Sequence, residues 1–301
     1  MKYFFSLFIG LFFLSVNAQN YMDLIRMSYA NTPLNDFNNN EGQTRLEELG
    51  LEINFPIVLN KKATLLSGIT ASSDNLKFDS NVSGYTSLYS VRFLLGLNQI
   101  YSDKWSGTYV LLPKIASDLN KISKEDFQLG FLSLLTYSKR VNLKYKIGLY
   151  VNTEKYGPLA VPLFGLYYKS LDKKFETNLT LPGRADINYQ LFGKTNFGVN
   201  FQGFNSSYNL NKPIYDGSGN YIVKSSNELF AYLTFQLGKS IYLKTNAGYS
   251  ISRTYKIFDN KDKVNLALSS IYFGDSRSQL NTNFEKGIIF KLELIYRFDF
   301  K

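Results

Sequence analysis

The segment 284–301, FEKGIIFKLELIYRFDFK, alternates between apolar and charged side chains with a period of two. The apolar residues Leu292 and Leu294 lie at even positions, and the charged residues Lys291 and Glu293 lie at odd positions. A period of two predicts a β-strand with one apolar and one polar face. The alternation also continues for longer than a typical strand of a soluble protein. A strand of this kind fits a membrane, with its apolar face against lipid and its charged face inward.

The same alternation recurs along the whole chain and predicts fourteen strands. The predicted strands lie near 20–30, 46–58, 63–73, 86–101, 105–117, 126–138, 142–152, 162–170, 174–182, 185–192, 195–206, 226–237, 240–253 and 284–300. An even number places both chain termini on the periplasmic side of the membrane. Twelve strands is the alternative, if the first segment is a plug or if 162–170 does not cross fully.

Short and long connections alternate between these segments. Short polar turns, such as Asn60-Lys61-Lys62 and Gly238-Lys239, separate longer links rich in Asn, Ser and Asp. The longer links lie near 31–45, 74–85, 117–125, 153–161, 207–225 and 254–282, and Pro182-Gly183-Arg184 is brief. Short periplasmic turns with longer outer loops are typical of outer-membrane barrels. The predicted fold is therefore all-β, a transmembrane antiparallel up-and-down β-barrel.

The first residues predict export. Lys2 precedes an apolar run from Tyr3 to Leu14, and Val16-Asn17-Ala18 forms a small-residue cleavage site. We predict a signal peptide over 1–18 and a single barrel domain over 19–301. An uncleaved anchor is the alternative, but the apolar run is shorter than the ~20 residues of a spanning helix. A soluble exported β-sandwich would also alternate, with its polar face outward. We expect the protein to lie in the cell outer membrane of a Gram-negative bacterium.

The composition argues against an enzyme. The chain has no His and no Cys, which removes imidazole and thiol chemistry and the usual soft metal ligands. Glu48 and Glu52 share a strand face but lie roughly 13 Å apart, too far for a glycosidase pair. We find no phosphate-binding or calcium-binding loop, and we expect no catalytic, cofactor or metal site.

Charged side chains on the predicted inward faces are nearly balanced in sign. The candidate lumen-lining residues are Arg26, Glu48, Glu52, Arg92, Lys144, Lys146, Glu176, Asp186, Glu228, Lys244, Lys291, Glu293, Arg297 and Asp299. Arg253 is placed on the same face. The formal net charge is +10, and its excess lies mainly in the short turns, which favours contact with anionic lipid headgroups. Nothing favours nucleic-acid binding, which needs a basic patch with exposed aromatics.

Four stretches in the middle of the chain carry a family resemblance. They are 111–119 (LLPKIASDL), 126–130 (DFQLG), 161–168 (VPLFGLYY) and 179–189 (LTLPGRADINY). In that order they resemble an uncharacterised outer-membrane β-barrel family, a domain of unknown function, of Bacteroidota-type bacteria. The resemblance implies the fold and the location, and it brings no site residues.

Three functions stay open at this point. The chain could be a passive or substrate-specific channel for small solutes, or a structural or surface-interaction barrel with a filled lumen. Aromatics predicted to point inward favour a partly filled lumen; these are Tyr109, Tyr150, Phe230, Tyr232 and Tyr242. A transporter of apolar ligands would need an N-terminal plug, for which few residues are left. Expected partners are outer-membrane lipids, small solutes and the barrel assembly machinery, which recognises an aromatic-rich final strand.

Overall fold

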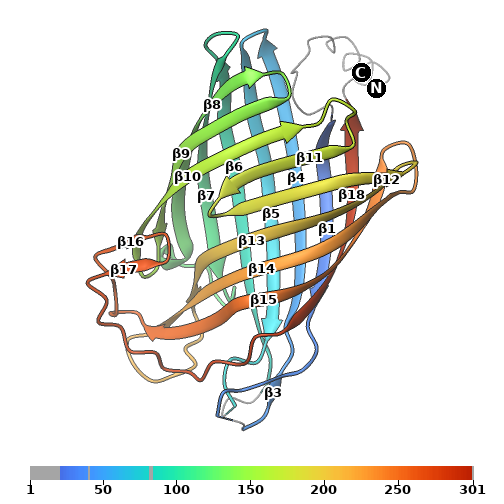
Figure 1. Ribbon diagram of the computed structural model, residues 1–301. Helices are drawn as coiled ribbons and strands as arrows, with labels where there is room; N and C mark the ends of the chain where they lie inside the picture. Colours follow the sequence, from blue (N-terminus) through green and yellow to red (C-terminus); the bar gives the residue numbers. More distant parts are fainter. Residues whose placement is uncertain (1–20, 40, 81–83, 300–301) are drawn as a thin grey trace, which may run out of the picture.

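Fourteen antiparallel strands close into a barrel in the computed structural model, which describes residues 21–39, 41–80 and 84–299 (Figure 1). They are β1 (Tyr21–Asn31), β4 (Glu47–Asn60), β5 (Ala63–Leu76), β6 (Thr86–Ile100), β7 (Trp105–Ser117), β8 (Phe127–Arg140), β9 (Leu143–Glu154), β10 (Gly157–Lys169), β11 (Phe175–Leu181), β12 (Arg184–Phe192), β13 (Thr195–Leu210), β14 (Asn220–Gln236), β15 (Ile241–Asp259) and β18 (Ile288–Asp299). The predicted fourteen-strand barrel is confirmed. The predicted signal peptide, 1–18, lies outside the described residues.

The last strand closes on the first. β18 pairs with β1 in an antiparallel register that sets Met27 opposite Leu294 and Ser28 opposite Glu293. On its other side β18 pairs with β15. Closure satisfies the backbone hydrogen bonds of both terminal strands, which hydrocarbon would otherwise leave unpaired.

The alternation in sequence becomes a difference in exposure. On β18, Leu292 and Leu294 are 51% and 45% exposed on the outside, whereas Glu293 between them is 4% exposed. The other strands repeat this pattern of large apolar side chains outside. An apolar exterior around a closed barrel is the surface that lipid covers in membrane-spanning barrels. No helix in the described part of the chain is long and apolar enough to cross a membrane.

The two ends of the barrel differ. β1 begins and β18 ends at the same end as the short turns, which we term the turn end (Figure 1). The opposite loop end carries the longer connections, with a small hairpin of β2 (Asn35–Asp36) and β3 (Gln43–Thr44) and a 3-10 turn, Lys124–Asp126. A second hairpin of β16 (Leu266–Leu268) and β17 (Ile271–Phe273) attaches to the edge of β10.

One predicted loop is absent, and several strands extend into predicted links. The expected link over 153–161 is a tight turn of Lys155 and Tyr156, because Gly157 adopts a positive φ of +136° there. β14 begins at Asn220 and β15 continues to Asp259, within links that were expected to be loops. Polar Asn, Ser and Lys residues made these stretches resemble loops, but their backbones pair in one continuous ladder.

Three strands extend over the loop end as a lid. β12 pairs with β13 only as far as Gln202, and β18 pairs with β15 only as far as Tyr249. Beyond those points residues 203–210, 220–227 and 251–259 continue as a three-stranded sheet, here called the lid strands. Asn209 of the lid pairs through its backbone with Ser117 of β7, on the opposite wall. Figure 1 shows β13, β14 and β15 running obliquely across the molecule toward the loop end.

Apolar side chains fill the space beneath the lid. Tyr208, Ile222, Tyr255 and Ile257 of the lid strands pack with side chains from β5, β6, β7 and the loops. Their partners include Leu76, Leu88, Ala116, Phe37, Phe78 and Phe284. This cluster, here called the loop-end core, closes the loop end of the barrel.

Candidate binding cavity

A polar cavity of about 420 Å³ lies in the half of the barrel nearest the turn end. Its lining comes from strands around most of the barrel, among them β1, β4, β9, β11, β12 and β15. Here it is called the turn-end cavity. None of its lining residues belongs to the loop-end core.

A bulge in β1 builds one wall of the turn-end cavity. The register of β1 against β18 shifts between Asp23 and Ile25, so one extra residue is accommodated there. Residues three apart on a regular strand point to opposite faces, but the bulge lets Asp23 and Arg26 share the inner face. The Arg26 guanidinium lies 2.8 Å from the Asp23 carboxylate.

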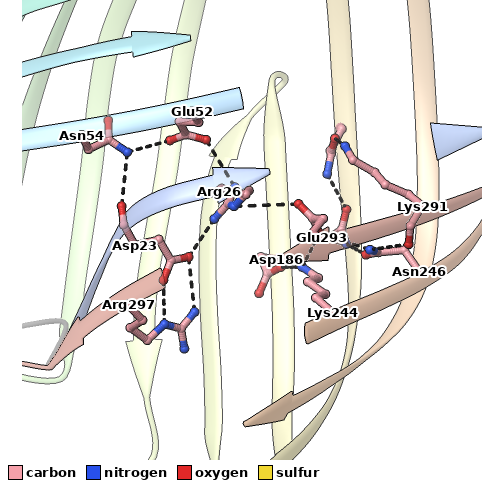
Figure 2. Close-up of polar contacts among 12 residues, drawn as sticks. Asp23, Arg26, Glu52, Asn54, Asp186, Lys244, Asn246, Lys291, Glu293 and Arg297 are labelled. Atoms are coloured by element: carbon pink, nitrogen blue, oxygen red, sulfur yellow. Dashed lines mark hydrogen bonds and ion pairs between the residues drawn. The ribbon is translucent and has the colours of Figure 1, made fainter. Parts of the chain in front are cut away.

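Asp23 and Arg26 anchor a chain of ion pairs across this wall (Figure 2). Asp23 also accepts a 2.6 Å hydrogen bond from Nε of Arg297. Arg26 lies 3.5 Å from Glu52 and 3.8 Å from Glu293. Each charge on this wall therefore has a partner of opposite sign, and the wall is compensated internally.

Lys244 links that wall to β12. Its ammonium lies 3.8 Å from Asp186 and 3.9 Å from Glu293 (Figure 2). The same ammonium lies 3.5 Å from the centre of the Tyr232 ring. The Tyr232 hydroxyl donates to Asp186 at 2.9 Å. Asn246 donates to Glu293 at 3.1 Å. Lys244 and Glu293 are thus held by several contacts each in a mostly buried setting.

Half of the predicted lumen-lining residues gather around the turn-end cavity. Those in its lining are Arg26, Glu52, Lys146, Glu176, Asp186, Lys244 and Arg297. Glu293 is buried beside them through its pairs with Arg26 and Lys244. The side chain of Asp299 is not among the side chains that the structure describes.

The other predicted residues lie elsewhere. Glu48 pairs with the lid, Glu228 accepts from Ser226, and Lys291 contacts Gln202. Lys144 and Arg92 lie on β9 and β6, both partly buried. The Arg253 side chain is buried under the lid, with its guanidinium 5.7 Å from the centre of the Phe284 ring.

One aromatic residue was placed on the wrong face. Tyr109 pairs with Leu97 and lies two residues from Leu111, which is exposed on the outside. Its hydroxyl contacts that of Tyr101 at 2.8 Å on the exterior. In β7 both faces are apolar, so the alternation gave no sign of which face points outward.

Sequence reasoning missed the ion cluster that fastens the lid. Lys224 of the lid lies 2.5 Å from Glu48 on β4 and 2.8 Å from Asp74 on β5. Tyr255 donates to Asp74 at 3.1 Å. Lys224 and Asp74 both fell in links that were expected to be loops, so their faces could not be assigned.

A second missed pair lies near the other edge of the lid. Lys114 on β7 and Glu154 on β9 are both buried, 3.5 Å apart. Lys114 also donates to Ser206 of the lid at 2.8 Å, and Glu154 accepts from the hydroxyl of Ser207. Lys114 stands opposite Arg92 in the ladder, a register that could have marked it as inward.

The described residues offer no metal centre. Nowhere in them do three Asp or Glu side chains converge in a way that could hold an ion, and the chain has no His or Cys. The charged groups are instead arranged as ion pairs and hydrogen bonds around a polar cavity. That arrangement can bind and orient a polar solute.

The fold and the cavity define a class: a closed fourteen-strand barrel of the membrane-spanning type, with an apolar exterior and a polar cavity inside. A family model described as "Domain of unknown function (DUF6268)" matches residues 14–293, so the chain belongs to that family. The predicted family resemblance is confirmed at this level, and its bacterial group stays a prediction.

Solved outer-membrane proteins share the general architecture at low similarity. The NanC porin is 10% identical, with 90% of this chain and 98% of that chain covered and a TM-score of 0.38. The TodX monoaromatic hydrocarbon channel, as its deltaS2 mutant, is 11% identical over 94% and 91% of the two chains, at a TM-score of 0.39. OccK7 (OpdD) of Pseudomonas aeruginosa is 11% identical over 91% and 98%, at 0.32. No curated protein matches the chain significantly.

Proposed function

We propose that this protein is an integral outer-membrane barrel that binds a small polar solute in the turn-end cavity and passes it only when the lid opens. The observation that carries the proposal is a polar, charge-lined cavity at the turn end, combined with an apolar packed core at the loop end. A channel of this kind is substrate-selective and gated, because the apolar side chains of the loop-end core pack against the lid strands.

The proposed location rests on the outer surface and the turns. Large apolar side chains cover the outside of the strands, which suits lipid. Lysines such as Lys61, Lys62 and Lys239 lie exposed in the turns, where they would meet anionic headgroups of the inner leaflet. The proposal includes export by a signal peptide over residues 1–18. It also includes recognition of the aromatic-rich final strand by the barrel assembly machinery.

The loop-end core also supports a second function. A barrel whose loop end is packed with Phe37, Phe78, Phe284 and Tyr255 could serve as a structural or surface-interaction protein that conducts nothing. Transport of apolar ligands is a weaker candidate, because the lining of the turn-end cavity is mainly polar and charged.

A reversible tether of the lid distinguishes these functions. Ser117 and Asn209 are backbone partners of the lid and the opposite wall, and adjacent strands are close enough for a disulfide. The chain has no Cys of its own, so Ser117→Cys with Asn209→Cys introduces a single possible bridge. Each single variant serves as a control.

Single-channel recording in planar bilayers gives the readout. We expect intermittent openings in the wild type, their loss in the oxidised double variant, and their return on reduction. A steady conductance that oxidation leaves unchanged would show a permanently open pore. Silence of the wild type and of the reduced variant alike would favour the structural barrel.

A further inference from the structure

We infer that the turn-end cavity selects anionic solutes, and that Arg184 and Lys146 carry this selectivity. The inference rests on the proposed function and names the class of solute: a small molecule bearing a carboxylate, sulfonate or phosphate group. It arises from the distribution of paired and unpaired charges in the lining.

The basic residues of the lining outnumber the acidic ones, five to four. Asp23, Glu52 and Asp186 are engaged with Arg26, Arg297 and Lys244. Glu176 is paired with Lys169, which lies outside the lining, at 3.2 Å. Every carboxylate of the cavity therefore already has a cation beside it.

Two cations of the lining have no such partner. Arg184, at the start of β12, is exposed and lines the cavity, and its side chain makes no hydrogen bond or ion pair within the described part of the chain. Lys146, on β9, donates only to the amide oxygen of Asn178, at 2.8 Å. An amide oxygen carries no charge, so both cations are available to an anion.

The strand register brings these two cations toward each other. Lys146 stands opposite Gly165, Gly165 opposite Thr180, and Thr180 opposite Arg184. A Cβ on Gly165 would lie 2.9 Å from Cβ of Lys146 and 3.0 Å from its Cδ. The bare glycine thus lets the Lys146 stem lie across β10 and deliver its ammonium to β11, the strand next to Arg184.

The chemistry of the pair defines the solute class. Guanidinium groups bind carboxylate and phosphate through paired hydrogen bonds, and an ammonium adds a compact positive charge. Amide and hydroxyl groups of Asn178, Asn188 and Thr180 in the same lining can hold the uncharged part of the solute. A volume of about 420 Å³ suits one small molecule.

Three probes of equal length but different charge test this inference. Glutarate is a dianion, glutaramide is its neutral diamide, and 1,5-diaminopentane is a dication. Titration calorimetry on the full-length barrel in lipid nanodiscs measures the affinity for each probe. We expect glutarate to bind at least roughly tenfold more tightly than the other two, and more weakly as salt rises.

Charge-removing variants locate the effect. Arg184→Gln and Lys146→Gln should each weaken glutarate binding roughly tenfold and leave glutaramide unchanged. Lys239→Gln, which removes a turn lysine outside the lining, is the matched control and should change neither.

Several results would overturn the inference. Equal affinity for glutarate and glutaramide, tighter binding of 1,5-diaminopentane, absence of glutarate binding, or an Arg184→Gln variant that keeps full glutarate affinity would each do so. None of these results changes the outcome expected from the conductance experiment with the tethered lid. Failure of the anion inference is therefore separable from failure of the proposed gated channel.

Discussion

Neighbouring residues on one strand have opposite environments, and β18 gives the sharpest case. Leu294 faces outward, whereas Glu293 contacts Arg26, Lys244 and Asn246 inside. Leu294→Arg places a charge against lipid and should cost about 2–4 kcal/mol. Glu293→Leu should cost less, about 1–2 kcal/mol, because Arg26 and Lys244 each keep another carboxylate partner.

Urea midpoints of folding into liposomes measure both variants. We expect the larger loss of stability for Leu294→Arg. An equal or larger loss for Glu293→Leu would mean that Asp23 and Asp186 do not compensate the two cations, and that the interior is drier than the polar cavity implies.

Lys224 is the residue on which the lid depends most. Lys224→Met leaves the carboxylates of Glu48 and Asp74 buried without their shared cation, which should cost about 3–5 kcal/mol. Adding Glu48→Gln and Asp74→Asn removes the stranded charges and should recover much of the loss. Thermal unfolding in detergent measures the stability of the wild type, the Lys224→Met variant and the triple variant. A triple variant no more stable than Lys224→Met would show that the cluster acts by packing.

At this scale the sequence assigns residues to a face only where the alternation is unbroken. Glu293, Lys244 and Arg26 were assigned to the inner face from period two alone. Asp23 was missed because the bulge beside it breaks the period, and no residue pattern in the sequence marks that bulge. Pairing partners depend on which strands meet across the barrel, and alternation along one strand holds no information about that.

At the scale of the element, the strands follow from the sequence far better than the lid does. Strands with one apolar and one polar face were placed to within a few residues. The lid strands have buried side chains on both faces, as at Tyr221, Ile222 and Val223, and carry many Asn and Ser residues. Their pairing depends on the opposite wall, so a local pattern could not reveal it.

The two ends of the barrel should differ in access to protease. Lys121 and Lys261 are exposed in loop-end connections, and Lys61 and Lys239 are exposed in short turns. Trypsin added to intact cells should cut after Lys121 or Lys261 and spare the turns. Mass spectrometry of the fragments identifies the sites, and opening the outer membrane is the control. Cleavage at Lys61 or Lys239 on intact cells would reverse the topology.

At the scale of the whole molecule, the barrel has a half that can hold solute and a half that is packed. The turn end keeps a cavity because its inward side chains are polar and are held apart in ion pairs. The loop end is filled because three long strands cross it and carry apolar side chains inward. The proposed gated binding protein rests on that division.

Access to the turn-end cavity from one side tests this central claim most directly. Three single-cysteine variants are needed: Asn188→Cys in the cavity, Asp216→Cys in a loop-end connection and Lys239→Cys in a turn. A membrane-impermeant maleimide is added outside proteoliposomes that contain the barrel in both orientations. Asp216→Cys reports the fraction with the loop end outside, and Lys239→Cys reports the fraction with the turn end outside.

We expect Asn188→Cys to be labelled rapidly only to the extent of Lys239→Cys, because the lid blocks entry from the loop end. Rapid labelling of Asn188→Cys in both orientations would contradict this expectation and would show a lumen open from end to end.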